Sequence, residues 1–214
     1  VLSSTKTKND YVTITDHSFG SFTDSRDGIE YQTITIGNQE WMAENLKYLP
    51  SVVGPATVSE TTAYYYVYGY DGTDVTAAKA TANYTTYGVL YNWPAAMNAC
   101  PTGWHLPSDA EWTELTDYLG GSGVAGGKLK EIGTTHWNTP NTDATNETGF
   151  TALPGGYRRD VGYFSIIGYL GFWWSATEFS TYSAWTRFMY YDLSSVIRSN
   201  DFKELGFSVR CLRD

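Results

Sequence analysis

The chain has 214 residues and a formal net charge of −9, from 23 acidic and 14 basic side chains. A single domain of this length buries roughly 70% of the surface that its unfolded chain exposes. The negative charge argues against binding to nucleic acid or to an anionic membrane surface, both of which need a basic face, and no apolar run approaches the roughly 20 residues of a membrane span.

The composition is typical of an exported, loop-rich protein. The chain contains 21 Gly, 18 Tyr and 8 Trp, and aromatic side chains make up 16% of it. The sequence starts Val-Leu-Ser-Ser, without Met and without the basic and apolar segments of a secretion signal. We therefore expect a secreted protein, or one anchored at the outer membrane or cell surface, for example as a lipoprotein, through a segment outside this sequence.

The first predicted elements are a strand and two turns. Residues 1–26 are polar and alternate only weakly, which is compatible with a strand or with a linker from a preceding module. Asp27-Gly28 and Gly37-Asn38 are turn sequences, and the apolar residues of 31–36 alternate as in a half-buried strand.

Two helices are predicted in the middle of the chain. A proline suits the first turn of a short helix over 94–98. A second helix is predicted over 108–119, because Ser108 is a good N-cap and Glu111 completes a capping box. Apolar residues then follow at helical spacing as far as a pair of glycines, which is a common helix end.

The remaining segments are predicted to be loops and short strands. Residues 50–86 and the Gly-rich 120–127 show little periodicity, so we expect an irregular insertion and a flexible turn rather than a phosphate-binding loop. Short strands are predicted through 150–213. Two helices followed by many short strands predict an α+β domain and not a doubly wound sheet.

No arrangement of residues points to catalysis. The histidines His17, His105 and His136 are scattered, and the sequence contains no zinc-ligand, nucleophile-elbow or phosphate-loop motif. The acidic residues between 109 and 117 complement the positive N-terminus of the predicted helix or lie on its solvated face. We interpret these side chains as structural.

The loop 138–147 is the best candidate for a metal site. It offers carboxylate and amide oxygens, which hard cations such as calcium prefer, and Asn141, Asp143 and Asn146 are the candidate ligands. The loop lacks the spacing of an EF-hand, and Asx turns explain most loops of this composition. No other cofactor is expected.

Cys100 and Cys211 are the two cysteines of the chain. They are either buried free thiols or a disulfide that joins the middle of the domain to its last strand. A disulfide would close a loop of more than 100 residues, and the chain-entropy model gives such a loop about 4–5 kcal/mol as an upper figure. The exported character of the composition favours the disulfide.

Aromatic and arginine side chains are concentrated in the C-terminal half. A strand over 184–191 would place Trp185 and Arg187 on one face and Phe188 and Tyr190 on the other. One face must be core. The other, if exposed, would present groups that are enriched at binding hot spots and suited to stacking on sugar rings. The alternative is that most of these rings fill the core.

Seven segments of the chain together carry a resemblance to a known family. They are 27–31, 36–46, 87–93, 99–107, 149–158, 173–178 and 206–211. In combination they resemble the Fibrobacter succinogenes major paralogous domain, which is common in exported proteins of Fibrobacter and gut Bacteroidetes. The resemblance runs from about residue 27 to the end of the chain and so implies a domain over residues 27–214, although residues 50–86 are longer and more irregular than is usual in that family.

That family is similar in turn to formylglycine-generating enzymes and to C-type lectin-like domains. The resemblance implies a C-type lectin-like fold with two helices, a twisted antiparallel sheet, long loops, and N- and C-terminal strands that lie close together. It also supports the disulfide, since Cys100 and Cys211 fall where such a domain could link its first helix to its last strand.

Two departures from these relatives bear on function. Formylglycine-generating enzymes use a pair of reactive cysteines near the C-terminus, where this chain has only Cys211. Calcium-dependent lectins carry Glu-Pro-Asn or Gln-Pro-Asp and Trp-Asn-Asp triplets, which are absent from the sequence. Neither the oxidase chemistry nor the calcium-dependent sugar site is therefore carried over.

A third group of relatives, the retroelement-diversified binding proteins, uses the C-terminal strands and loops of this fold as a variable ligand face. That resemblance places the ligand face at about residues 173–201. The ligand-binding residues that it implies are Trp173, Trp174, Glu178, Tyr182, Trp185, Arg187, Tyr190, Arg198, Asn200 and Asp201.

We therefore expect an exported or cell-surface binding or adhesion domain without catalytic activity, which recognises a glycan or a protein. One alternative is an oxidase of the formylglycine-generating type, or a degenerate relative of it. The other is a structural module of a surface or pilus assembly.

Overall fold

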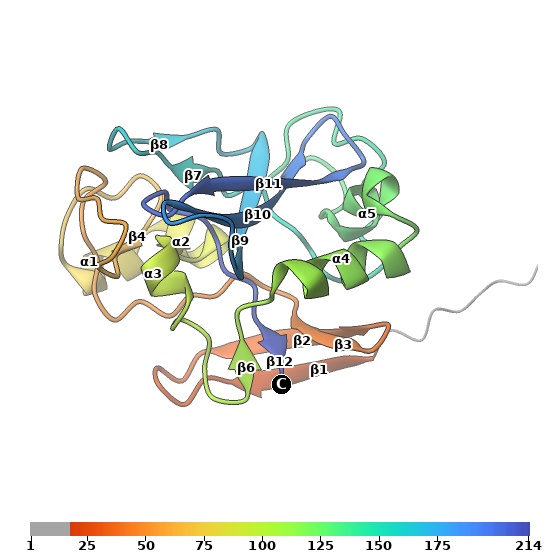
Figure 1. Ribbon diagram of the computed structural model, residues 1–214, viewed down its shortest axis with the longest axis horizontal. Coiled ribbons are helices and arrows are strands. Elements are labelled where there is room, and N and C mark those ends of the chain that lie inside the picture. The colour runs from red at the N-terminus through yellow and green to blue at the C-terminus, as the bar shows by residue number, and fades with distance from the viewer. Residues whose placement is uncertain (1–17) are drawn as a thin grey trace, which may run out of the picture.

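The computed structural model describes residues 18–214, and its two larger sheets lie on either side of helix α4 (Asp109–Tyr118) (Figure 1). Residues 1–17 lie outside the described residues, and with them lie His17 and most of the predicted N-terminal strand or linker. The architecture is mixed α+β with antiparallel sheets, which confirms the predicted fold class at this level.

The larger sheet contains both the first and the last described strand. Its antiparallel order is β1-β2-β3-β12-β6. The predicted turns at Asp27-Gly28 and Gly37-Asn38 are confirmed, and both glycines have a positive φ that other residues rarely adopt. The strands are β1 (Phe19–Thr23), β2 (Glu30–Ile36), β3 (Gln39–Met42), β6 (Trp104–His105) and β12 (Leu212–Arg213).

The second sheet has three antiparallel strands in the order β11-β10-β9. They are β9 (Leu170–Glu178), β10 (Ser183–Tyr190) and β11 (Val196–Phe202). Two short ribbons pair β4 (Tyr65–Tyr66) with β5 (Leu90–Tyr91) and β7 (Tyr157–Arg158) with β8 (Phe164–Ser165).

A disulfide joins Cys100 to Cys211, with the two Cα atoms 5.9 Å apart, which confirms the predicted pairing. Cys211 is fully buried and directly precedes β12, and Cys100 lies shortly before β6. Because β12 and β6 are neighbours in the larger sheet, the disulfide reinforces a pairing that the backbone hydrogen bonds already make.

The two predicted helices are present. In α4, Ser108 Oγ accepts a hydrogen bond from the backbone N–H of Glu111, and the Glu111 carboxylate accepts one from the N–H of Ser108, so the capping box is complete. The shorter helix is α3 (Trp93–Ala96), which begins after an N-cap at Asn92 and carries its proline in the first turn.

The prediction of only two helices is wrong. Within residues 18–214 there are five, and α1 (Val75–Lys79) and α2 (Ala82–Tyr87) lie inside the segment predicted as an irregular insertion. Their side-chain N-caps, Asp74 and Thr81, are the local signal that periodicity alone does not reveal.

The Gly-rich segment predicted as a flexible turn forms the helix α5 (Ser122–Leu129). Its glycines permit close packing. A Cβ on Gly126 would lie 2.5 Å from the carbonyl oxygen of Ser195, and one on Gly127 would lie 2.6 Å from that of Asp143. Two backbone segments therefore rest directly on the helix, and a side chain at either glycine would separate them.

Helix α4 is the centre of one of the two buried cores. Trp112 contacts three aromatic rings. They belong to Trp41 of the larger sheet, Trp173 of the smaller sheet, and Phe150 of the segment between α5 and β7. All four side chains are fully buried. The helix thereby fixes the position of the smaller sheet relative to the larger one.

Candidate functional site

Trp173 and Trp174 are fully buried, so the prediction that they contact a ligand is wrong. The indole N–H of Trp173 donates to Asn45 Oδ1 at 3.0 Å, and that of Trp174 donates to the carbonyl of Tyr91 at 2.7 Å. Both rings fill the core, and both polar atoms are satisfied internally.

Arg187 is also an internal residue, and its predicted role in ligand contact is wrong. Its side chain is 2% exposed. The guanidinium donates to Asp109 Oδ1 at 2.8 Å, to Thr113 Oγ1 at 3.1 Å and to the carbonyl of Thr186 at 3.1 Å. Helix α4 covers this face of β10, so neither face of the strand is as open as the alternation of residues suggests.

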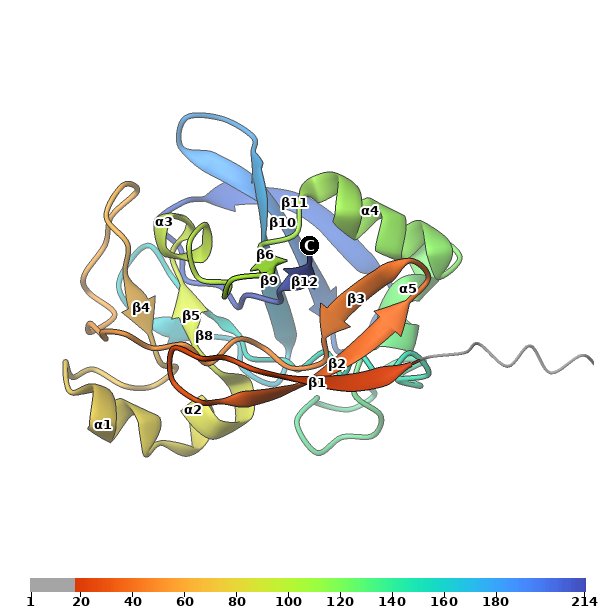
Figure 2. The same cartoon turned by 90° about the horizontal axis from the view of Figure 1, so that it is seen from below.

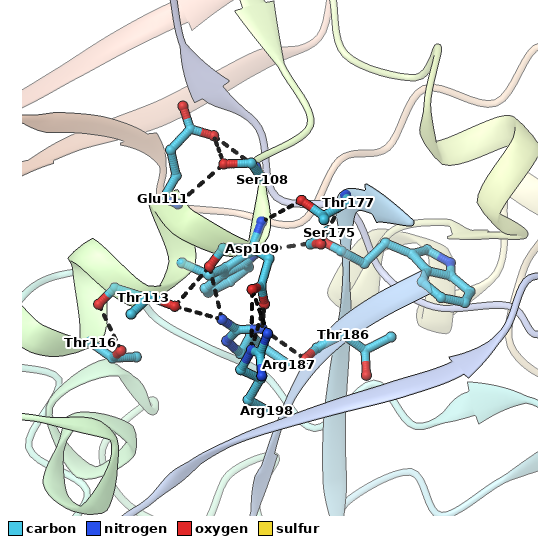
Figure 3. Close-up of polar contacts among 12 residues, drawn as sticks. Ser108, Asp109, Glu111, Thr113, Thr116, Ser175, Thr177, Thr186, Arg187 and Arg198 are labelled. Atoms are coloured by element: carbon cyan, nitrogen blue, oxygen red, sulfur yellow. Dashed lines mark hydrogen bonds and ion pairs between the residues drawn. The ribbon is translucent and has the colours of Figure 1, made fainter. Parts of the chain in front are cut away.

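Asp109, the first residue of α4, binds two arginines at once (Figure 3). Its carboxylate accepts from Arg187 and, through both oxygens, from Arg198 on β11, with closest distances of 2.8 Å in each case. Burial alone would raise the pKa of Asp109, but the hydrogen bonds and positive charges of Arg198 and Arg187 outweigh burial and lower it. The carboxylate is therefore held in its charged form.

Arg198 continues this network to the surface. Its guanidinium carbon lies 3.4 Å from the centroid of the Trp185 ring, a stacked cation–π contact. Phe179 meets the same ring edge-on, with the centroids 4.9 Å apart. The Trp185 ring is thus fixed in place from two sides, and Arg198 is fixed by Asp109.

Four aromatic side chains gather where β9 turns into β10 and where β11 ends, and we call this group the aromatic end. Three of them are largely exposed: Phe179 by 52%, Tyr182 by 60% and Phe202 by 56%. Trp185 is the half-buried fourth. The register places Ser183 opposite Phe202 and Trp185 opposite Asn200, so Trp185 and Phe202 share one face. In Figure 2 the turn between β9 and β10 projects beyond the rest of the domain.

The other predicted ligand residues divide between this region and the rest of the sheet. Exposed Asn200 lies opposite Trp185, and exposed Glu178 forms an ion pair with the Lys203 ammonium. Asp201 points to the opposite face, where it accepts from Thr186 Oγ1 at 2.7 Å; burial raises the pKa of its carboxyl, and the Thr186 hydrogen bond only partly opposes this. Tyr190 lies at the far end of β10.

The amides of the candidate calcium ligands Asn141 and Asn146 make separate contacts within their part of the chain. Asn141 donates to the carbonyls of Glu131 and Gly133, whereas Asn146 binds the backbone and hydroxyl of Thr151. Asn141, Asp143 and Asn146 all have a positive φ, as Asx residues in tight turns often do. The side-chain amides of Asn141 and Asn146 thus hold neighbouring backbone in place. Within residues 18–214 no group of three or more His, Cys, Asp or Glu side chains is arranged to hold a metal.

The two described histidines each pair with carboxylates. His105 Nδ1 lies 2.7 Å from Asp214 Oδ1 and its Nε2 lies 3.0 Å from Glu111 Oε1. Burial would lower the pKa of His105, but the hydrogen bonds that its ring donates to the carboxylates of Asp214 and Glu111 outweigh burial and raise it. His136 bonds to Glu131. These contacts connect β6, α4 and the C-terminus, which is an architectural role.

No helix in the described part of the chain, residues 18–214, is long and apolar enough to cross a membrane. The sequence model of the Fibrobacter succinogenes major domain matches residues 34–213. Comparison with curated proteins and with solved structures gives no match. The match covers most of the chain and includes the cysteine pair, α4 and the aromatic end. The chain therefore belongs to the Fibrobacter succinogenes major domain family.

Proposed function

We propose that this domain is a non-enzymatic binding or adhesion module of an exported protein, and that its ligand, a surface protein or a glycan, docks on the aromatic end. The observation that carries this proposal is the gathering of Phe179, Tyr182, Trp185 and Phe202 at one projecting end of the sheet. Large aromatic side chains in this setting are the residues that dominate binding energy at interfaces.

The support beneath these rings favours binding over incidental exposure. Arg198 and Phe179 both contact the Trp185 ring, and Arg198 forms an ion pair with Asp109 at the start of α4. Asp109 forms a second ion pair with the buried Arg187. A ring that is already ordered loses little conformational entropy when a ligand covers it. The arrangement therefore supports a preformed contact surface.

We further propose that the fold is C-type lectin-like, as the relatives of the family suggest. Three features support this: the first described strand and the last lie in one sheet, the disulfide links the segment before β6 to β12, and β9–β11 form a separate sheet beyond the helices. In that fold the C-terminal strands present the ligand face, which agrees with the location of the aromatic end.

The alternative of a formylglycine-generating oxidase has less support. That chemistry needs a reactive thiol, and both cysteines of the chain form the disulfide. Mass spectrometry with and without reductant, together with copper titration, separates the two functions. Free thiols and stoichiometric copper binding would favour the oxidase, whereas an intact disulfide and no copper uptake would favour a binding module.

The proposal is tested by probing glycan arrays and immobilised extracellular proteins, including mucin and collagen, with the labelled domain. We expect a positive signal that Trp185→Ala and Tyr182→Ala each abolish. Tyr118→Ala is the matched control, because Tyr118 is equally exposed at the end of α4 and away from the aromatic end. Binding that both variants retain would contradict the proposal, and concentration-dependent self-association without any ligand would favour the structural module.

A further inference from the structure

A hollow lies at the other end of β10, away from the aromatic end. It has a volume of about 410 Å³ and a mainly apolar lining. Trp185 of the aromatic end and Tyr190 of the hollow are five residues apart on β10, or roughly 17 Å at the usual rise of a strand. This volume is within the range of roughly 300–1,000 Å³ that small-molecule sites occupy. The lining residues are Ile166, Tyr169, Leu170, Tyr190, Tyr191, Asp192 and Leu193.

The rim of the hollow is held in place by a buried cation. Lys130 is completely buried, and its ammonium donates to the carbonyls of Tyr190 at 3.1 Å, Leu193 at 2.8 Å and Thr142 at 3.0 Å. On the other side, the N–H of Tyr191 donates to the carbonyl of Tyr169 at 2.9 Å. The loop that leaves β10 is therefore fixed at several points, and the hollow is preformed.

The floor of the hollow contains a strained residue. Ile166 has a φ of 59°, a left-handed conformation that is rare for a β-branched side chain. Its carbonyl accepts from the N–H groups of Tyr169 and Leu170, so this turn fixes the backbone that carries the Tyr169 ring. Strain of this kind persists where the surrounding structure enforces it, and it concentrates at binding sites.

The lining combines apolar rings with polar groups that have no partner in residues 18–214. The hydroxyls of Tyr169, Tyr190 and Tyr191 make no hydrogen bond there, and the Asp192 carboxylate forms no ion pair. Tyr169 and Leu193 are 47% and 42% exposed, so the hollow opens to solvent. A ligand that fits has an apolar face for the rings and hydroxyl donors at its edge.

Charge narrows the ligand further. The Asp192 carboxylate on the rim disfavours an anionic ligand, and the three carbonyls that accept from the buried Lys130 ammonium leave it no free donor with which to offset that effect. Burial lowers the pKa of Lys130 to about 8, so the ammonium is still predominantly charged at neutral pH. The complementary ligand therefore carries no negative charge, is polyhydroxylated and is flat on one face.

We propose that this hollow is a binding site for a neutral pyranose, either a free sugar or one residue of a glycan. The C–H face of the ring packs on Tyr169 and Tyr191, which meet edge-to-face with centroids 5.3 Å apart. The sugar hydroxyls donate to the Asp192 carboxylate and exchange hydrogen bonds with the phenol hydroxyls. The site is distinct from the aromatic end and does not depend on the function proposed for it.

The test is a titration of the ¹⁵N-labelled protein, followed by NMR, with the methyl glycosides of glucose, galactose, mannose, xylose and N-acetylglucosamine. We expect at least one glycoside to shift the amides of 166–170 and 190–193 in a saturable way. Tyr169→Ala is expected to weaken this binding at least tenfold. Tyr169→Phe, which keeps the ring and removes one hydroxyl, is expected to weaken it by roughly threefold, as for one hydrogen bond.

The charge of the ligand provides a second, independent test of the site. Methyl glucuronide should not bind the unmodified protein, and Asp192→Asn should admit it while weakening the neutral glycoside. Tyr118→Ala is the control for both arms, and unchanged amide spectra outside the hollow establish that each variant is folded. The proposal is overturned if no glycoside shifts these amides, if the shifts lie at 179–185 instead, or if Tyr169→Ala titrates like the unmodified protein.

Failure of the sugar-site proposal can be told apart from failure of the binding function proposed for the aromatic end. Loss of macromolecular binding in Trp185→Ala with an unchanged glycoside titration would support both sites separately. Macromolecular binding that is indifferent to Trp185 but sensitive to Tyr169 would remove the aromatic end and keep the hollow.

Discussion

The side-chain oxygen of Asn45 accepts hydrogen bonds from the buried guanidinium of Arg210, at 3.2 Å and 3.3 Å. It also accepts the indole N–H of Trp173, and its amide nitrogen donates to the carbonyl of Tyr87 and to Ser208 Oγ. Four of the segments that mark the family therefore converge on one buried amide. These segments therefore carry residues that hold the interior of the domain together.

Replacing Asn45 by alanine should destabilise the domain strongly. The Trp173 N–H would be left without an acceptor, and Arg210 would lose one of its partners in the interior. Unsatisfied buried donors of this kind cost about 1–3 kcal/mol each, and more when charged. We expect the free energy of unfolding in guanidinium to fall by at least about 2 kcal/mol. Exposed Asn98→Ala is the control and should change it little; equal stability of the two variants would contradict the role of Asn45.

Two glycines of α5 give opposite predictions for the same substitution. Gly123→Ala meets nothing within 4 Å and should stabilise the domain by up to about 1 kcal/mol, the difference in helix propensity. Gly126→Ala brings a Cβ to 2.5 Å from the Ser195 carbonyl and should destabilise it despite the better propensity. Thermal melts of both variants check the signs. Stabilisation by Gly126→Ala would mean that the contact with Ser195 is not close.

Asp109 and Arg198 form an ion pair, but replacing them should have different effects on stability and on ligand binding. Asp109→Ala leaves the buried Arg187 guanidinium without its carboxylate, and breaking such a pair costs about 3–5 kcal/mol. Arg198→Ala removes an exposed partner and should change stability by less than about 1 kcal/mol. It should nonetheless weaken ligand binding, since Trp185 loses the group stacked on it. Denaturation and array binding, measured on the same two variants, separate the roles; equal loss of stability would be the contrary result.

His105 gives a pH dependence with a defined sign. Its pKa is raised in the folded state, so its contribution to stability is fully present below the unfolded pKa of about 6.5 and is lost as pH rises through the folded value. The stability difference between the unmodified protein and His105→Gln should therefore shrink between mildly acidic and mildly alkaline pH. Thermal melts over that range measure it. A difference that grows with pH would show that the two carboxylates do not hold the charged imidazole.

Reduction tests the disulfide. The bond spans 111 residues of sequence, and the chain-entropy model assigns a loop of that length about 4–5 kcal/mol as an upper figure. Unfolding in guanidinium should shift to clearly lower concentration with dithiothreitol, and Cys100→Ala/Cys211→Ala should show the same shift without reductant and no further effect of it. A reductant effect that persists in the double variant would have another cause.

The elements with a local signal were predictable from the sequence. The capping box at Ser108 and Glu111 depends on neighbours three residues apart, and the turn glycines Gly28 and Gly37 depend on their own φ. α5 could not be predicted in this way. Its glycines are required by Ser195 and Asp143, which lie far away in sequence, and only the folded chain shows that contact.

The same distinction applies to the candidate site. Alternation predicted that one face of 184–191 is core and left the other as a candidate ligand face, but α4, coming from residues 109–118, covers Arg187 and makes it internal. Tryptophan is a common residue at binding sites, but in the folded chain Trp173 and Trp174 lie in the core, where their indole N–H groups donate to Asn45 and to the carbonyl of Tyr91. Tyr182 and Trp185 were predicted as ligand residues and lie at the aromatic end. Phe179 and Phe202 were not predicted, because the hairpin turn and the strand register that place them there exist only in the folded chain.

The position of the disulfide has a mechanical consequence. Residues 101–210 lie inside the covalent loop that Cys100 and Cys211 close, and this loop includes α4, α5, all of β9–β11, and therefore both the aromatic end and the hollow. Tension applied between the two ends of the chain passes across the sulfur–sulfur bond from residue 100 to residue 211 and bypasses everything between them. Stretching from the two ends can thus extend the N-terminal strands β1–β3 while the region that contains the aromatic end and the hollow stays unextended.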